Sequence, residues 1–203
     1  LGIGLSALVS ALMLTVFQTQ LVYFLMHGRL WLMIATFPEL GLVFVASSMA
    51  AKNSPAALPV FLIYSVLNGF TLSFVVAFYT PGTVLSAFVS SALLFFVMAA
   101  IGIFTKKDLS GMGRALMAAL VGLIIAMIVN IFLASGFFDY MISIAMVLVF
   151  SGLIAWDNQK IRYVYEQSRG QVATGWVISM ALSIYLDFIN LFLSILRIFG
   201  RND

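Results

Sequence analysis

Seven long apolar stretches, separated by short segments rich in polar residues, glycine or proline, divide the chain. They cover residues 1–26, 30–51, 56–78, 83–104, 114–133, 138–156 and 172–199. A stretch of about 20 apolar residues crosses the hydrocarbon core of a bilayer as an α-helix. Strands of a membrane barrel would alternate polar and apolar residues, and these stretches do not. The pattern predicts an all-α membrane protein with seven transmembrane helices in a single domain over residues 1–203.

The composition excludes a water-soluble domain. Hydrophobic residues make up 64% of the chain and charged residues only 8%, whereas soluble domains contain roughly 25% charged residues. The lipid bilayer is therefore the expected partner. The formal net charge of +3 indicates basic loops at an anionic lipid surface and not a nucleic-acid-binding protein. Because the chain begins at Leu1 inside an apolar run, we expect a further segment to precede it.

Residue types that are rare or missing exclude several kinds of chemistry. The chain has no cysteine and one histidine, His27. Thiolate metal centres, disulfide frameworks and cysteine nucleophiles are thereby excluded, and a catalytic triad would depend on His27 alone. We expect a protein that is not an enzyme and holds no tightly bound cofactor.

The basic residues between the stretches predict the orientation in the membrane. Counted over alternate loops, seven fall on one side and three on the other. The first side receives Lys52, Lys106, Lys107, Arg114, Lys160, Arg162 and Arg169, and the second Arg29, Arg197 and Arg201. Since cytoplasmic loops carry the excess of lysine and arginine, this pattern places the N-terminus in the cytoplasm.

Three acidic residues stand out because the bilayer makes them unfavourable. Glu39 and Asp187 lie inside predicted spans, and Asp157 lies at the end of the sixth. A carboxylate at the centre of a bilayer costs about 2.5–3.5 kcal/mol on insertion scales, so it normally faces protein or water, has a partner or is protonated. These residues are candidate proton sensors. Glu39 is either a proton or cation site or a protonated side chain bonded to a neighbour.

A narrow polar stripe follows the last apolar stretch. At 100° per residue, six of its polar residues fall within an arc of about 80°. They are Ser179, Ser183, Asp187, Asn190, Ser194 and Arg197. Such a stripe lines a hydrated path or hydrogen-bonds to neighbouring helices, and Asp187 favours the path. We expect Asn68 and Asn130 only to join helices.

Several strings resemble the transmembrane Bax inhibitor motif family, in particular its bacterial members. The most specific is SMALSIYLDFINLFLSILRIF at residues 179–199, followed by AWDNQKI at 155–161. Shorter matches are NSP at 53–55, YSVLNGFTLS at 64–73 and TKKDLS at 105–110. The resemblance implies a seven-helix fold in which the last helix is central, in the bacterial inner membrane.

The resemblance also implies a pH-sensitive calcium leak, set by two aspartates at the positions of Asp157 and Asp187. In this hypothesis the pair is the proton sensor and gate, and its oxygens form a weak calcium site. Calcium is the transported ion, and Ser183, Asn190 and Glu39 complete the ion pathway with Asp187. Family members that latch the aspartates use an arginine, and that position here is Ala50. Lys52 is the candidate replacement, although lysine lacks the bidentate guanidinium.

Two other functions stay open from the sequence. The chain is alternatively a membrane interaction protein that modulates cell death or a membrane protease through membrane-protein partners. An intramembrane aspartyl protease is the enzyme alternative, because two aspartates on adjacent helices could share a proton and activate water. The sequence before Asp187 argues against this alternative. In that class of protease the second aspartate ends a Gly-x-Gly-Asp string, whereas Asp187 follows Tyr185 and Leu186.

Overall fold

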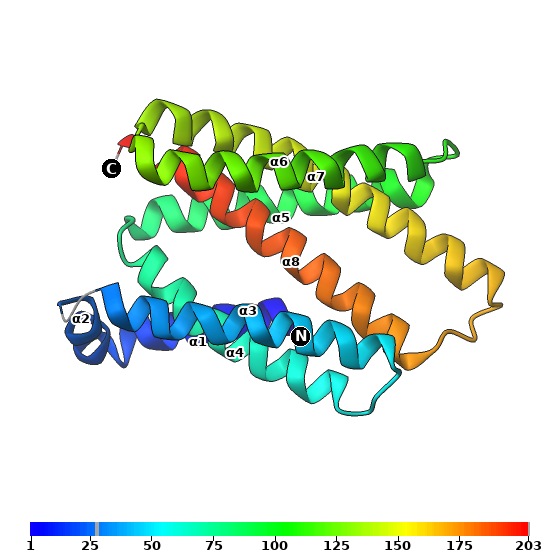
Figure 1. Cartoon of the computed structure of the whole chain (residues 1–203), viewed down its shortest axis with the longest axis horizontal. Helices are drawn as coiled ribbons and strands as arrows, with labels where there is room; N and C mark the ends of the chain where they lie inside the picture. The colour runs from blue at the N-terminus through cyan, green and yellow to red at the C-terminus, as the bar shows by residue number, and fades with distance from the viewer. Residues whose placement is uncertain (27–28, 203) are drawn as a thin grey trace. The chain divides into compact units, whose positions relative to one another are not determined.

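The protein is all-helical over the described part of the chain, and no strand occurs there (Figure 1). The computed structural model describes residues 1–26 and 29–202, and the side chains of these except at 24, 25, 29–38, 40 and 202. His27 lies outside the described residues. The helices are α1 (Gly2–Thr15), α2 (Gln18–Met26), α3 (Arg29–Ala51), α4 (Ala57–Val76), α5 (Pro81–Phe104), α6 (Ser110–Leu133), α7 (Gly136–Gln167) and α8 (Thr174–Phe199), and a short 3-10 helix, Gly200–Asn202, follows.

In the part of the chain that the structure describes, five helices, α4 to α8, are long and apolar enough to cross a membrane. Within the described residues, α1 and the Gly41–Ala51 part of α3 are shorter apolar helices. The prediction of a helical protein with several membrane-length segments is therefore confirmed. Five such segments occur within the described residues, and the predicted count of seven is not confirmed.

The prediction of one helix over residues 1–26 is wrong. This stretch forms two short helices, α1 with 14 residues and α2 with 9. At the junction the backbone N–H groups of both Val16 and Phe17 bond to the carbonyl of Leu12, so the regular helical ladder ends there. The following Gln18, Thr19 and Gln20 are polar, which removes the apolar drive to continue one membrane-length helix.

The sequence predicts that the sixth span ends at residue 156 and that a polar connection follows it, but most of that connection is helical. Helix α7 continues without interruption to Gln167 and is 32 residues long. It ends in a turn in which Arg169 and Gly170 have positive φ angles of 51° and 82°. The Gly170 N–H bonds back to the Tyr165 carbonyl at 3.0 Å, which is a common way to end a helix. The polar residues after Asp157 thus belong to a helix.

Local signals explain where other helices begin and end. Thr80 caps α5 by accepting a hydrogen bond from the Thr83 N–H, with Pro81 at the first helical position. Ser135 caps α7 in the same way through the Phe138 N–H. At the end of α6, the Asn130 side chain accepts a hydrogen bond from the Ser135 N–H at 3.2 Å. Asn130 therefore serves a helix end, contrary to its predicted role between helices.

The chain divides into two compact units. Unit 1 comprises Leu1–Tyr79 and Val172–Tyr185, and unit 2 comprises Thr80–Gln171 and Leu186–Asp203. Helix α8 therefore contributes its first half to unit 1 and its second half to unit 2. In unit 1, α4 packs against α1 and α3, and in unit 2, α7 packs against α5 and α6.

Small residues bring the helices of each unit close together. In unit 1, a Cβ on Gly69 would lie 2.6 Å from the backbone oxygen of Ser6, so α4 and α1 approach at this glycine. In unit 2, Gly102 of α5 and Gly113 of α6 lie against Ala155 and Trp156 of α7. Small residues commonly mediate such close packing in membrane helices.

Candidate functional site

Asp157 is a buried carboxylate on α7 in unit 2, with only 4% of its surface exposed. The preceding residues fix its position: the Ala155 backbone lies against Gly102, and the Trp156 ring lies against Gly113. Because a Cβ on either glycine would overlap these atoms, α7 is packed closely against α5 and α6 at this level.

Asp187 is the second buried carboxylate of unit 2, on the C-terminal half of α8, and is 6% exposed. The next residue, Phe188, packs edge-to-face against Phe88 and Phe95 of α5, with ring centroids 5.9 and 5.6 Å apart. Phe192 makes a similar contact with Phe88 at 6.2 Å. These aromatic contacts set the rotation of α8 and with it the direction of Asp187.

The two aspartates interact electrostatically within unit 2. The Asp187 Oδ2 atom is buried and has no hydrogen-bond partner among the described residues. Two ionised carboxylates in a poorly solvated position repel each other, and one proton shared between them removes that repulsion. The arrangement thus has two states that differ by one proton.

The pair offers few ligands to a metal ion. In the described part of the chain, no group of three or more histidine, cysteine, aspartate or glutamate side chains converges. Calcium takes six to eight oxygen ligands in a stable site. Asp157 and Asp187 alone supply fewer oxygens than such a site requires.

The polar stripe of α8 uses part of its hydrogen-bonding capacity within the helix. Asn190 donates its side-chain N–H to the Leu186 carbonyl at 2.8 Å, and Ser194 donates to the Asn190 carbonyl at 2.7 Å. The Ser194 hydroxyl hydrogen and one Asn190 amide hydrogen are thus used within the helix, and the Asn190 side-chain oxygen and the Ser194 hydroxyl oxygen can act as acceptors. Ser183, one turn before Asp187, is half-buried and belongs to the unit 1 half of the helix.

The predicted pathway residue Glu39 belongs to unit 1, whereas Asp187 and Asn190 belong to unit 2. Glu39 is 8% exposed and accepts a hydrogen bond of 2.5 Å from the Thr71 hydroxyl. Its position thus matches one of the two readings that the sequence leaves open, a buried glutamate bonded to a neighbour.

The candidate latch residue Lys52 is exposed just beyond the end of α3. Ala50, at the position of the family's arginine, is only 2% exposed and packs with Ala57 and Ile178 in an apolar cluster of unit 1. The surroundings of Ala50 thus suit a small apolar side chain.

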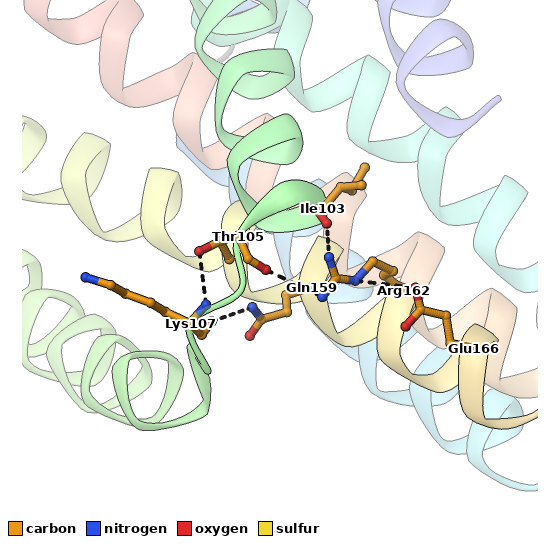
Figure 2. A network of polar contacts seen from close by, with 6 residues as sticks. All are labelled: Ile103, Thr105, Lys107, Gln159, Arg162 and Glu166. Carbon is orange, nitrogen blue, oxygen red and sulfur yellow. Dashed lines mark hydrogen bonds and ion pairs between the residues drawn. The ribbon is translucent and has the colours of Figure 1, made fainter.

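The C-terminal part of α7 is held by a network of polar contacts (Figure 2). The sequence analysis did not predict this network. The Gln159 side chain accepts a hydrogen bond from the Leu109 N–H and donates one to the Lys107 carbonyl, each at 2.8 Å. Arg162 donates to the Ile103 carbonyl at the end of α5 and lies 3.7 Å from a Glu166 carboxylate oxygen.

This network ties the loop between α5 and α6 to the helix that carries Asp157. Gln159 and Arg162 are three residues apart and therefore share one helix face. That signal is present in the sequence once α7 is continued past residue 156. It supports the prediction that the loop lysines and the polar end of α7 lie on the same side of the membrane.

The helices and their buried carboxylates define a multi-pass helical membrane protein. The sequence comparison assigns it more closely: the family described as "Inhibitor of apoptosis-promoting Bax1" matches residues 1–203, so the chain belongs to the Bax inhibitor family. The resemblance seen in the sequence is thereby confirmed.

Relatives of the chain are bacterial membrane proteins. An uncharacterized membrane protein of Streptococcus pyogenes serotype M1 is 57% identical over 203 residues, which is 100% of this chain and 89% of the relative. The inner membrane protein YbhL of Escherichia coli K12 is 40% identical over 181 residues, covering 87% of this chain and 77% of YbhL. Protein YrjE of Lactococcus lactis is 47% identical over 199 residues, 98% of this chain and 85% of YrjE.

Proposed function

We propose that the protein is a pH-sensitive leak pathway for calcium and other cations in the bacterial inner membrane, gated by Asp157 and Asp187. The observation that carries the proposal is the pair itself. Two carboxylates, each less than a tenth exposed, lie on two helices of one unit and interact electrostatically. Passage of an ion requires no covalent chemistry, and calcium is the ion carried and not a resident cofactor.

The proposed gate works through repulsion between like charges. With one proton shared, the pair is held together and the pathway is closed. When that proton leaves for water, two negative charges face each other, so α8 moves away from α7 and the oxygens attract a hard cation. Flux is therefore expected to increase as pH rises.

The ion pathway is proposed to follow the polar stripe of α8, with Ser183, Asp187 and Asn190 as its contacts. The proposed central place of α8 is supported by its burial. Of the 18-residue apolar stretch of α8, 61% is buried, the highest share among the five membrane-length helices of the described residues. The side-chain oxygen of Asn190 and the hydroxyl oxygen of Ser194 are acceptors that suit a positively charged ion, and each residue donates one hydrogen bond within the helix.

Calcium flux into liposomes at a series of pH values tests the gate. The wild type is compared with Asp157→Asn, Asp187→Asn and the double variant, with the exposed Glu166→Gln as control. Asparagine cannot lose the proton, so each single variant should keep the low flux of the acidic wild type at alkaline pH, and the double variant should add little. Wild-type flux and pH response in Asp187→Asn would overturn the proposal.

The proposed orientation has its own test because the chain contains no cysteine. A single cysteine replacing Lys107, in the loop held by Gln159, should react with a membrane-impermeant thiol reagent only when the cytoplasmic face is accessible. A cysteine replacing Arg201 should react from the opposite face. The reverse labelling pattern would overturn the orientation.

A further inference from the structure

Glu39 is a buried carboxyl group that the gate in unit 2 leaves unexplained. It lies on α3 in unit 1, and hydrogen bonds reach it from the Thr71 hydroxyl, at 2.5 Å, and from the Asn68 side chain. Within the described residues, no lysine, arginine or histidine forms a salt bridge with it. A buried carboxylate without a cationic partner is unfavourable unless hydrogen bonds or a proton compensate.

A chain of hydrogen bonds continues from this site to α8 and α1. Asn68 accepts a hydrogen bond of 2.8 Å from the Tyr185 hydroxyl of α8. That hydroxyl is 2.7 Å from the Ser6 hydroxyl of α1, whose single hydrogen is shared between the Tyr185 oxygen and the Ser65 carbonyl, 2.6 Å away. Ser6, Ser65 and Tyr185 are at most 2% exposed. The network therefore joins four helices inside unit 1.

Thr71 can accommodate both protonation states of Glu39. When Glu39 is ionised, the Thr71 hydroxyl donates its hydrogen to the carboxylate. When Glu39 is protonated, its own O–H donates to the Thr71 oxygen, and the Thr71 hydrogen turns to the Asn68 backbone carbonyl, 3.1 Å away. A purely structural glutamate would need partners for one state only.

The same partners disfavour a metal ion at Glu39. The Thr71 hydroxyl donates its hydrogen to the Glu39 carboxyl group. The Asn68 side-chain N–H also donates to Glu39, while the Asn68 side-chain oxygen accepts from the Tyr185 hydroxyl. A hard cation requires acceptor oxygens pointing at it. Donors directed at a carboxylate stabilise its negative charge, and a proton is the ligand that fits between these groups.

We infer that Glu39 is a second proton-binding site, separate from the aspartate pair and linked to α8 through Asn68 and Tyr185. When Glu39 loses its proton to water, the Asn68 N–H bonds an ionised acceptor, and this stronger bond polarises the Asn68 bond to Tyr185. The titratable groups that interact with Glu39 are Tyr64 and Tyr185, and α1 carries none. The inference rests on unit 1 alone and is independent of calcium passage.

Infrared difference spectroscopy of the reconstituted full chain across a pH step tests this site. The wild type should show the carbonyl stretch of a carboxylic acid that disappears as pH rises. Glu39→Gln should lose one component of that band, whereas Asp187→Asn and the exposed-site control Glu166→Gln should keep that component. Because no ion flux is measured, the result does not depend on the proposed leak.

Two further variants test the link to the neighbouring helices. Thr71→Val and Tyr185→Phe each remove one hydroxyl and should shift the Glu39 band, Thr71→Val more strongly because its contact is direct. Thr71→Ser keeps the hydroxyl and should restore the wild-type band. A spectrum of Glu39→Gln identical to that of the wild type would overturn the site. A band that is lost in Glu39→Gln but does not move in Tyr185→Phe would overturn the link to α8.

Discussion

Gly102 of α5 lies so close to Ala155 of α7 that a Cβ on the glycine would stand 2.1 Å from the Ala155 carbonyl oxygen. The obstructing atoms belong to the backbone, so no side-chain rotation relieves the contact. Gly102→Ala should therefore force the two helices apart and lower stability by about 1–3 kcal/mol, the range typical of overpacking.

Thermal unfolding in detergent measures this effect. Gly122→Ala on α6 is the matched control, since a Cβ there meets nothing within 4 Å. It should leave the midpoint unchanged or raise it, because alanine is the better helix former. Equal midpoints for the two variants would contradict the close packing of α5 against α7.

A second prediction concerns the beginning of α8. The Asn53 side chain accepts a hydrogen bond of 2.6 Å from the Gly175 N–H, and Asn53 itself has a positive φ of 50°. Asn53→Gly keeps the backbone conformation and loses only this bond, which should reduce stability by about 1 kcal/mol. Asn53→Ala loses the bond and adds backbone strain, so it should unfold earlier than Asn53→Gly. The opposite order of their unfolding midpoints would exclude this role.

A third prediction concerns the network at the end of α7. Gln159→Ala leaves the Leu109 N–H and the Lys107 carbonyl without their side-chain partner. Losing a hydrogen bond worth about 1 kcal/mol corresponds to roughly five-fold faster amide exchange. Hydrogen–deuterium exchange of the peptide containing Leu109 measures this change. Lys160 is the exposed neighbour of Gln159, so the control variant Lys160→Ala should show the wild-type exchange rate in this peptide. An equal increase of the exchange rate in both variants would argue against the network.

The helical class follows from the sequence because long apolar runs in lipid have few alternatives to helix. The positions at which helices begin and end do not follow from the apolar runs alone. The end of α1 near Val16 depends on a few polar residues in an otherwise apolar stretch. The extension of α7 to Gln167 is rich in polar residues, and two of them, Gln159 and Arg162, contact the end of α5 and the loop after it, so hydropathy does not reveal it.

The candidate sites were visible to different degrees. Asp157, Asp187 and Glu39 are conspicuous because a carboxylate in an apolar run is rare. Thr71 and Tyr185 are ordinary residues in membrane helices, and their relation to Glu39 arises only when α3, α4 and α8 pack together. Sequence reasoning therefore finds the charged members of such sites more readily than their neutral partners.

The loop before α6 should contribute a pH-dependent term to stability. Hydrogen bonds from the Ser110 side chain and backbone hold the pKa of Asp108 below its usual value, and the Arg114 charge acts in the same direction. A lowered folded-state pKa means that ionised Asp108 stabilises the fold at neutral pH. That contribution is lost as pH falls through the folded-state pKa.

Thermal unfolding at neutral and strongly acidic pH checks this prediction. Asp108→Asn keeps a side-chain acceptor without a titratable charge, so its midpoint should fall less on acidification than that of the wild type. Ser110→Ala removes only the side-chain hydrogen bond and should give an intermediate response. Identical acid profiles for all three proteins would show that Asp108 contributes no such term.

The last prediction concerns the position where family members carry the latch arginine. Ala50 is packed against Ala57 and Ile178, so Ala50→Arg should bury an unpaired charge and destabilise the protein by about 3–5 kcal/mol. Ala51→Arg places the same side chain on the exposed neighbouring position and should be tolerated. If Lys52 performs the latch instead, Lys52→Ala should keep the unfolding midpoint within about 0.5 kcal/mol yet shift the pH at which calcium flux begins. If Ala50→Arg is as stable as the wild type and also shifts the pH at which calcium flux begins, the apolar cluster around Ala50 can accommodate an arginine and this prediction is wrong.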